Sequence, residues 1–308
     1  MRILVILATI DEYNMLISTI KNNSFFKVTS IYTKSKDSLN DSKANDSLNR
    51  SNQQKFKSNS LSYKTRVVEE KTFFNFSEIK YNYLDKEIYM IALYSNFGML
   101  NASCATIFGL ERFYPDIVIN LGAAGSLNKN FNIGDIVTPF RVFYSTYQDT
   151  ASLLFDPDFI KKITSLSPDQ PVESQFIQNL NRKSLGLNNI EKKLYKNILK
   201  NYPQIHKCII STQDFNVDSN EKKKFLKRVF EADVVDWESY AIKYSSNKYK
   251  TPCLILRVIT DLADENFEDD YKTNLETVLK KISEIFVNSI VSDVCKIYFS
   301  DINCSRKI

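Results

Sequence analysis

Residues 254–264 carry a continuous apolar run directly into two carboxylates, Asp261 and Asp264. The run follows Pro252 and is rich in branched side chains, which is typical of a strand buried on both faces of a mainly parallel sheet. Open α/β sheets bind their ligands at the carboxyl ends of the strands. The two aspartates are therefore expected at the mouth of a site, although an Asp-x-x-Asp pair can also cap the next helix and turn the chain.

The rest of the chain alternates short apolar runs with amphipathic stretches. Apolar runs predict strands over residues 3–7, 28–32, 79–83, 88–93, 116–120, 136–143 and 207–210. Helical spacing predicts helices over residues 12–20, 189–199 and 221–230, between Gly98 and Pro115, and along residues 275–294. The runs at 79–83 and 88–93 flank a turn at Asp85 and Lys86, which indicates a hairpin. This alternation predicts a single α/β domain spanning residues 1–308.

Residues 35–64 interrupt this pattern. They are dominated by Ser, Asn, Lys and Asp and contain few apolar side chains. A segment of this composition buries too little surface to offset the entropy lost on ordering. We predict a mobile polar insertion, and a solvated loop is favoured over a functional module.

The glycines are concentrated in one part of the chain. Only six are present, and five of them are Gly98, Gly109, Gly122, Gly125 and Gly134. Such economy suggests that each is kept for a positive φ angle or for close backbone approach. Residues 121–126 directly follow a predicted strand, so they are interpreted as a ligand-contacting loop. They match neither the dinucleotide-binding fingerprint nor the Walker pattern.

Cysteine and histidine usage argues against a metal site. The five cysteines are odd in number and lack any short paired spacing, which indicates reduced thiols in a cytoplasmic protein. With His206 as the single histidine and no Cys-x-x-Cys, neither a zinc site nor a cofactor is predicted. Acid and base chemistry is therefore expected to fall to carboxylates.

Charge and hydropathy bear on the partners of the chain. The net charge of +5 comes from scattered lysines, so no nucleic acid is expected, although weak binding to polyanions stays open. The apolar residues 1–10 run straight into Asp11 and Glu12 without a cleavage site, which favours a strand over an export signal. No run approaches the roughly 20 apolar residues that cross a bilayer, so no membrane association is predicted.

Four separated segments together resemble one family. They are the first strand leading to Asp11 and Glu12, residues 120–126 followed by 133–137, residues 236–238, and residues 257–264. In this order the chain resembles the nucleoside phosphorylase superfamily, and within it the 5′-methylthioadenosine/S-adenosylhomocysteine nucleosidases. The resemblance implies a three-layer α/β/α fold around a central mixed, mainly parallel twisted sheet.

The resemblance also implies a role for individual side chains. Glu12 matches a general base that activates water, and Asp261 matches a general acid that protonates adenine N7. Thr260 stands where a hydroxyl supports that acid, Glu238 matches the carboxylate that binds the ribose hydroxyls, and Phe215 matches an aromatic that stacks on the purine. The set is chemically coherent, because cleavage of an N-glycosidic bond passes through an oxocarbenium-like state that carboxylates stabilise.

Three further positions are implied to bind substrate: Trp237, Ala123 and Asn216. Trp237 replaces the methionine usual beside the ribose, and Ala123 stands where a serine is common. Ser145 follows Tyr144 where a histidine often lines the 5′ pocket. These departures leave the preferred 5′ substituent open.

Simpler explanations exist for each residue taken singly. Glu12 suits a helix N-terminus, Phe215 suits a core, and Glu238 suits an exposed helix face. Their shared placement at predicted strand ends and first helical turns favours the site. Arg257, inside a buried strand, is expected to pair with a carboxylate, either Glu238 or Glu12.

Hydrolysis is favoured over phosphorolysis. Phosphorylases of the superfamily resemble one another in carrying arginines on the N-terminal loop, whereas residues 8–12 contain none and include Glu12. The expected activity is hydrolysis of 5′-methylthioadenosine and S-adenosylhomocysteine, with 5′-deoxyadenosine as a further candidate, releasing adenine and a ribose derivative in methionine salvage. The alternatives are a nucleoside phosphorylase and a catalytically weak paralogue that binds polyanions or another protein.

The resemblance further implies a homodimer. Family members are commonly homodimers in which the partner contributes to the alkylthio pocket. The aromatic residues Phe143, Tyr144 and Tyr147 are candidates for that contribution, and a core or surface aromatic cluster explains them equally well.

Overall fold

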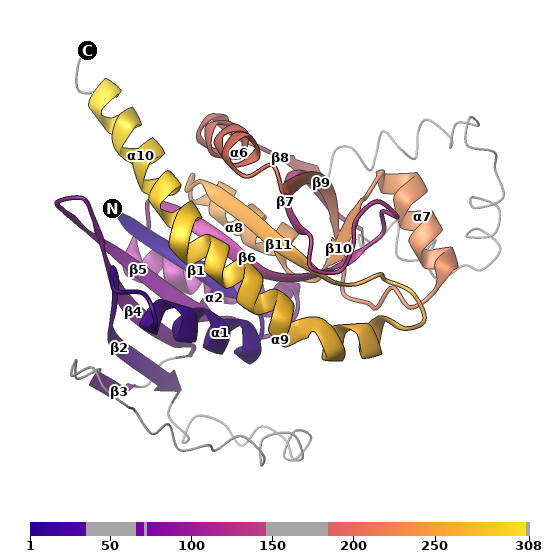
Figure 1. Ribbon diagram of the computed structural model, residues 1–308, viewed down its shortest axis with the longest axis horizontal. Helices are drawn as coiled ribbons and strands as arrows, with labels where there is room; N and C mark the ends of the chain where they lie inside the picture. The colour runs from indigo at the N-terminus through magenta and orange to yellow at the C-terminus, as the bar shows by residue number, and fades with distance from the viewer. Residues whose placement is uncertain (35–65, 71–72, 146–183, 306–308) are drawn as a thin grey trace.

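The computed structural model of the protein describes residues 1–34, 66–70, 73–145 and 184–305 (Figure 1). The described residues form an 11-stranded mixed sheet with the strand order β10-β9-β7-β11-β6-β1-β5-β4-β2-β3, in which β8 pairs with β7. The predicted insertion at 35–64 lies outside the described residues. No helix among those described is both long and apolar enough to span a bilayer.

Four parallel strands form the middle of the sheet: β11 (Cys253–Asp261), β6 (Ile117–Ser126), β1 (Arg2–Leu7) and β5 (Lys86–Tyr94). Every residue of β11 is buried, because the strand is central and covered on both faces. The buried strand predicted from the apolar run is therefore confirmed, as is the strand predicted at residues 3–7.

Antiparallel pairing extends the sheet beyond β5. The predicted hairpin is confirmed: β4 (Asn75–Tyr83) pairs antiparallel with β5 around Leu84, a residue with positive φ. β2 (Phe26–Lys34) pairs antiparallel with β4, and the short edge strand β3 (Arg66–Glu70) pairs parallel with β2.

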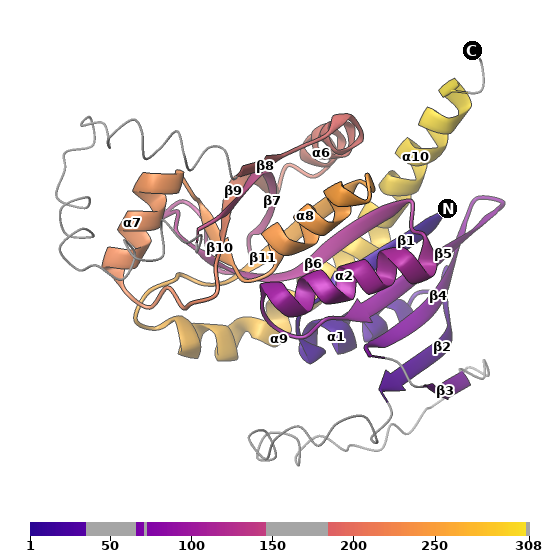
Figure 2. The ribbon, with the colours of Figure 1, turned by 180° about the vertical axis from the view of Figure 1, so that it is seen from behind.

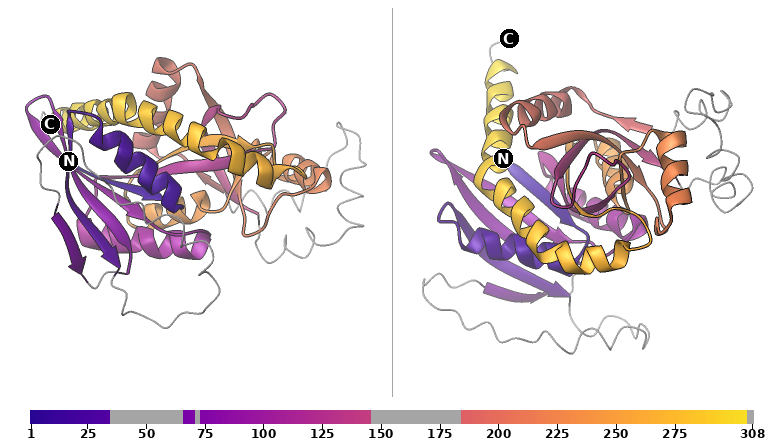
Figure 3. Two further views of the ribbon diagram at one scale, coloured as in Figure 1. Left: turned by 60° about the horizontal axis from the view of Figure 1, so that its bottom comes forward. Right: turned by 45° about the vertical axis from the view of Figure 1, so that its right-hand side comes forward.

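The other end of the sheet closes on itself. β7 (Ile136–Tyr144) lies between β11 and β9 (Ile205–Thr212), and it also carries β8 (Ser184–Gly186). The three-residue strand β10 (Val234–Asp236) pairs parallel with β9 and antiparallel with β6. Strands β10, β9, β7, β11 and β6 thus form a closed ring, seen end-on in the right-hand view of Figure 3.

Helices cover both faces of the sheet. α1 (Ile10–Lys21), α6 (Asn189–Asn201), α9 (Phe267–Ile285) and α10 (Val291–Ser305) lie on one face (Figure 1), while α2 (Met99–Phe113) and α8 (Ser239–Lys248) lie side by side on the other (Figure 2). α7 (Asn220–Phe230) packs at the closed end of the sheet. The single C-terminal helix predicted from residues 275–294 is interrupted by a π-helical turn at Phe286–Ile290.

The interpretation of residues 121–126 as a loop is wrong. They continue β6 and pair with both β11 and β10. Neither Gly122 nor Gly125 has a positive φ angle. These glycines are needed for space, because a Cβ at Gly125 would lie 2.7 Å from Asp261 Oδ1. Of the two reasons predicted for the glycines, close approach is the one that applies to Gly109 of α2, since a Cβ there would lie 2.5 Å from Leu4 Cδ2.

Candidate active site

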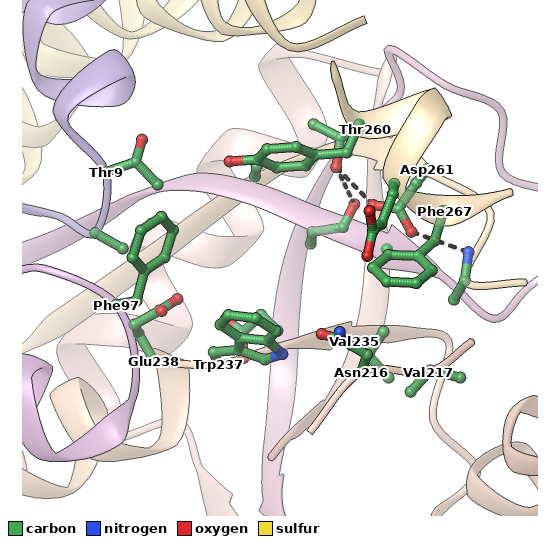
Figure 4. A pocket seen from close by; sticks show the side chains of 18 of the residues that line it. Thr9, Phe97, Asn216, Val217, Val235, Trp237, Glu238, Thr260, Asp261 and Phe267 are labelled. Atoms are coloured by element: carbon green, nitrogen blue, oxygen red, sulfur yellow. Dashed lines mark hydrogen bonds between the residues drawn. The ribbon is translucent and has the colours of Figure 1, made fainter. Parts of the chain in front are cut away.

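A cavity of about 320 Å³ opens at the carboxyl ends of the central strands (Figure 4). Its walls come from the segments that follow β1, β5 and β9, from β6, β10 and β11, and from the first turns of α9. This is where ligands of α/β sheets bind. Figure 4 shows two ends: Thr9, Phe97 and Glu238 lie at one, and Asp261, Phe267 and Asn216 lie at the other.

Glu12 enters the cavity from the first turn of α1. It forms a capping box with Thr9, whose hydroxyl accepts from Glu12 N–H at 3.0 Å. Its carboxylate accepts three backbone N–H groups, from Ala8 at 2.7 Å, Thr9 at 3.1 Å and Ala123 at 2.9 Å. Burial raises the pKa of Glu12, and nearby Arg257 and these N–H donors oppose that rise. Glu12 therefore caps its helix and also faces the cavity. Its raised pKa means that it can act there as a base.

Asp261 ends β11 just beyond a register shift between Ile259 and Asp261. Its Oδ2 accepts the Thr260 hydroxyl at 2.8 Å, and its Oδ1 accepts Ala263 N–H at 3.0 Å. Burial raises the pKa of Asp261, while these two hydrogen bonds oppose the rise. A carboxyl group in this setting is prepared to hold a proton and donate it.

Asp264 does not line the cavity. Its Oδ1 accepts Asn266 N–H at 2.9 Å, and its carbonyl accepts Phe267 N–H at 3.1 Å. It braces the turn into α9, so of the two aspartates only Asp261 faces the cavity.

The expected pairing of Arg257 with Glu238 is present, and a second carboxylate that was not predicted lies closer. Arg257 Nη2 lies 3.5 Å from Glu238 Oε2 and 2.6 Å from Asp236 Oδ2. Asp236 ends β10, and the pairing of β10 with β9 brings this carboxylate within 2.6 Å of the Thr212 hydroxyl as well. The ring closure that creates this pairing joins segments far apart in the chain, so no local pattern indicated it.

Glu238 is buried beside three other ionisable groups. It accepts Gly98 N–H at 3.1 Å. Burial raises its pKa to about 8; Arg257 opposes this rise, and Asp236 and Glu12 add to it. The single positive charge of Arg257 therefore lies among three carboxylates, those of Asp236, Glu238 and Glu12. This excess of negative charge favours binding of a proton to the cluster near neutral pH.

Most of the predicted site residues meet in this one cavity. The lining includes Glu12, Ala123, Asn216, Trp237, Glu238, Thr260 and Asp261. Phe215 is the exception and is corrected: it does not line the cavity. Its ring packs against the apolar cluster beneath α7, with Lys222 Nζ 5.9 Å from the ring centroid.

Several residues that line the cavity were not predicted from the sequence. Phe97 lies between two positive-φ residues, Asn96 and Gly98, and it meets Trp237 edge-to-face at 6.2 Å. Phe267 and Tyr271 also line the cavity, one turn apart on α9. Their spacing at the start of a helix that follows the predicted acid was a usable signal.

Two glycines of β6 give the buried charges their space. Gly122 lies opposite Arg257 in the register, and a Cβ there would collide with Arg257 Nη1 and lie 2.5 Å from Glu12 Oε1. We expect Gly122→Ala to lower the free energy of unfolding by about 1–3 kcal/mol, measured by chemical denaturation, because the closely packed ion cluster has to shift. Gly186→Ala is the matched control, since a Cβ there meets nothing within 4 Å. Equal stability of the two variants would contradict this packing.

No cluster suited to a metal ion is present among residues 1–34, 66–70, 73–145 and 184–305. The cavity is rich in carboxylates. Those that line it are Glu12, Asp236, Glu238, Asp261 and Glu268.

The fold and the cavity together define an α/β protein with a carboxylate-rich site for a small molecule at the carboxyl ends of its strands. The chain belongs to the phosphorylase superfamily, whose family model matches residues 54–292.

Individual relatives agree with this assignment. The chain is 27% identical over 209 residues to a protein of Bacillus licheniformis named 5′-methylthioadenosine/S-adenosylhomocysteine nucleosidase, covering 68% of this chain and 82% of the relative. It is 29% identical to the nucleosidase of that name from Buchnera aphidicola subsp. Baizongia pistaciae, covering 65% of this chain and 73% of the relative.

Two solved structures share the fold. Futalosine hydrolase of Helicobacter pylori superposes with a TM-score of 0.62 and 20% identity, covering 95% of this chain and 97% of that one. The Neisseria meningitidis 5′-methylthioadenosine/S-adenosylhomocysteine nucleosidase in complex with methylthio-immucillin-A gives a TM-score of 0.61 and 20% identity, covering 95% and 99%.

Proposed function

We propose that the protein hydrolyses the N-glycosidic bond of adenine nucleosides with a modified 5′ position. The substrates are 5′-methylthioadenosine and S-adenosylhomocysteine, with 5′-deoxyadenosine as a further candidate. The observation that carries the proposal is one cavity holding Asp261 near one end and Glu238 at the other, with Glu12 in its lining. The nucleosidase names of the relatives support the same chemistry.

Each carboxylate has a separate task in the proposed reaction. Asp261 donates its proton to N7 of the purine, so the electrons of the C1′–N9 bond leave with a neutral base. Glu238 binds the ribose hydroxyls. Glu12 takes a proton from water as the water oxygen bonds to C1′, and the products are free adenine and the 5′-substituted ribose. The negative charge around the sugar stabilises the oxocarbenium-like transition state.

The charge of the lining favours water over phosphate as the nucleophile. Within the described part of the chain, the lining contains five carboxylates and a single cation, Lys272, which is itself paired with Glu268 at 3.3 Å. Arg257 is engaged by Asp236 and Glu238. Both of these cations are therefore already paired with carboxylates, and neither is left to bind an anionic nucleophile, which supports hydrolysis.

The experiment is a direct assay of product. Purified protein is incubated with 5′-methylthioadenosine or S-adenosylhomocysteine, with and without phosphate, and adenine and the sugar product are quantified. Adenine release at a phosphate-independent rate, with free 5′-substituted ribose as co-product, is expected. Absence of adenine would favour the non-catalytic paralogue, and a sugar 1-phosphate product would favour the phosphorylase.

The rate should depend on pH through both carboxylates. Burial raises the pKa of Glu12 and of Asp261. As pH falls through the raised pKa of Glu12 the base becomes protonated, and as pH rises through the raised pKa of Asp261 the acid loses its proton. We therefore expect a bell-shaped profile of kcat/KM.

Thr260 provides a specific check of this profile. Its hydroxyl favours the ionised form of Asp261, so Thr260→Val should move the alkaline limb to higher pH by about 0.5–1 pH unit, the equivalent of one hydrogen bond. Thr260→Ser retains the hydroxyl and serves as the control. An alkaline limb that does not move in Thr260→Val would assign that limb to a group other than Asp261.

We further propose a homodimer that works in the cytoplasm in methionine salvage. Exposed apolar side chains gather on α2 and α8 and just beyond them, including Leu100, Ile107, Tyr244 and Tyr249. Aromatic enrichment of this kind supports a protein interface. Of the aromatics expected at the partner's pocket, Phe143 is buried against Phe230 and Tyr147 lies outside the described residues. The cysteines support the proposed location in the cytoplasm. Three of them, Cys208, Cys253 and Cys295, are buried free thiols, which suits a reducing compartment.

A further inference from the structure

The further inference concerns the base accepted by this site, and it rests on the proposed function. With Glu238 on the ribose, the base extends toward Asp261. Figure 4 shows Asn216 at that same end, across the cavity from Asp261 and Phe267. Asn216 is therefore placed to meet the purine.

Asp261 alone does not distinguish one purine from another. Its task is to donate a proton to N7, and N7 is present in 6-amino- and 6-oxopurines alike. Its two oxygens already accept the Thr260 hydroxyl and Ala263 N–H, which fix the orientation of the carboxyl group. Discrimination at the 6-position requires another polar group at this end of the cavity.

Asn216 is the best candidate for that polar group. The lining also contains Glu268 and Lys272, which pair with each other at 3.3 Å, and Gln213, whose side-chain oxygen accepts the Ser145 hydroxyl at 3.1 Å. The neighbouring wall is apolar and comprises Val217, Val235, Ala263 and Phe267. The backbone carbonyl of Asn216 accepts from Lys222 Nζ at 3.4 Å, which tethers the loop. Among the described residues, the side-chain carboxamide has no hydrogen-bond partner. An amide with free donor and acceptor groups in an apolar wall is suited to pair with a polar ligand.

We propose that Asn216 hydrogen-bonds the 6-substituent of the base, and that the site therefore accepts 6-oxopurine as well as 6-aminopurine nucleosides. A carboxamide offers C=O toward an amino group, or NH2 toward an oxo group after a half-turn of its terminal torsion. A site with a fixed donor pattern rejects the wrong partner by about 10⁴–10⁵-fold. An amide that turns removes that penalty.

The experiment compares 5′-methylthioadenosine with 5′-methylthioinosine. In the wild-type protein, kcat/KM for the two nucleosides should agree within about tenfold, as expected for one hydrogen bond of adjustable direction. Asn216→Asp offers acceptors only, so it should shift the ratio toward the 6-amino substrate by at least about tenfold. Asn216→Leu should weaken binding of both adenine and hypoxanthine, measured by calorimetry. Asn220→Leu, four residues along the chain and exposed, is the matched control.

The outcomes separate this inference from the function on which it rests. Cleavage of methylthioadenosine with a methylthioinosine rate about 1,000-fold lower would overturn the inference and leave the hydrolase intact. A substrate ratio that stays the same in Asn216→Asp would also overturn it. If neither nucleoside is cleaved, the proposed function fails. In that case the calorimetry tests base recognition alone. The inference is supported if the wild-type protein binds both adenine and hypoxanthine and Asn216→Leu weakens the binding of both. Any other result overturns the inference.

Discussion

Asp261→Asn should lower kcat for 5′-methylthioadenosine by about 10²–10⁴-fold, the range expected for loss of a general acid. An amide fills the same volume. Its oxygen can accept Ala263 N–H, and its NH2 can donate to the Thr260 hydroxyl, which has the Ala124 carbonyl as another acceptor, but the amide has no acidic proton to transfer to N7. The base would then have to leave as an anion. The measurement is the steady-state rate of adenine release.

A substrate with a better leaving group makes this test specific. 4-Nitrophenyl riboside expels a phenolate that needs no proton, so Asp261→Asn should cleave it at close to the wild-type rate. Asp264→Asn is the control, because Asp264 braces the turn outside the cavity. Equal losses on both substrates would show that Asp261 acts in some way other than as an acid.

Glu12→Gln should have a comparable effect and should affect both substrates. Without a carboxylate to accept its proton, water attacks C1′ about 10²–10⁴-fold more slowly whatever the leaving group. The variant should also be less stable by about 1–3 kcal/mol, since its NH2 group would face a backbone N–H that Glu12 now accepts. Rates are therefore measured well below the unfolding midpoint of the variant.

Asp11→Asn is the matched control for Glu12→Gln, because Asp11 is the exposed neighbour in the same helical turn. It should retain the wild-type rate on both substrates. A Glu12→Gln protein that is folded and fully active would transfer the role of base to another carboxylate of the cluster, with Glu238 the first to test.

Local patterns were sufficient for the elements that carry the site. β11 and most of α1 follow from apolar runs and helical spacing alone, because burial on two faces or one leaves a direct periodic signal. The positions of Glu12 and Asp261 at the ends of those elements follow in turn. The resemblance then supplied Glu238, Trp237 and Asn216, which the fold brings into the same cavity.

The features that could not be predicted from the sequence depend on pairing between strands that are far apart in the chain. Three residues of β10 are too few for a periodic signal, yet their pairing with β9 and β6 closes the ring and brings Asp236 to Arg257. Phe215 was misplaced because packing beneath α7 decides the direction of its ring. Residues 121–126 were predicted wrongly as a loop because their glycines make room for side chains of β11, the neighbouring strand in the sheet. No local sequence pattern reveals this contact.

The pairing of β6 with β11 also determines which wall of the cavity can be changed by protein engineering. On β6, Gly122 and Gly125 stand opposite Arg257 and Asp261, so any side chain added there intrudes on the reacting groups. The opposite wall, with Asn216, Val217 and Trp237, is built from partly exposed or apolar side chains that different residues can replace. A library randomised on that wall should yield folded variants with changed substrate range, while one randomised at the two glycines should yield almost none.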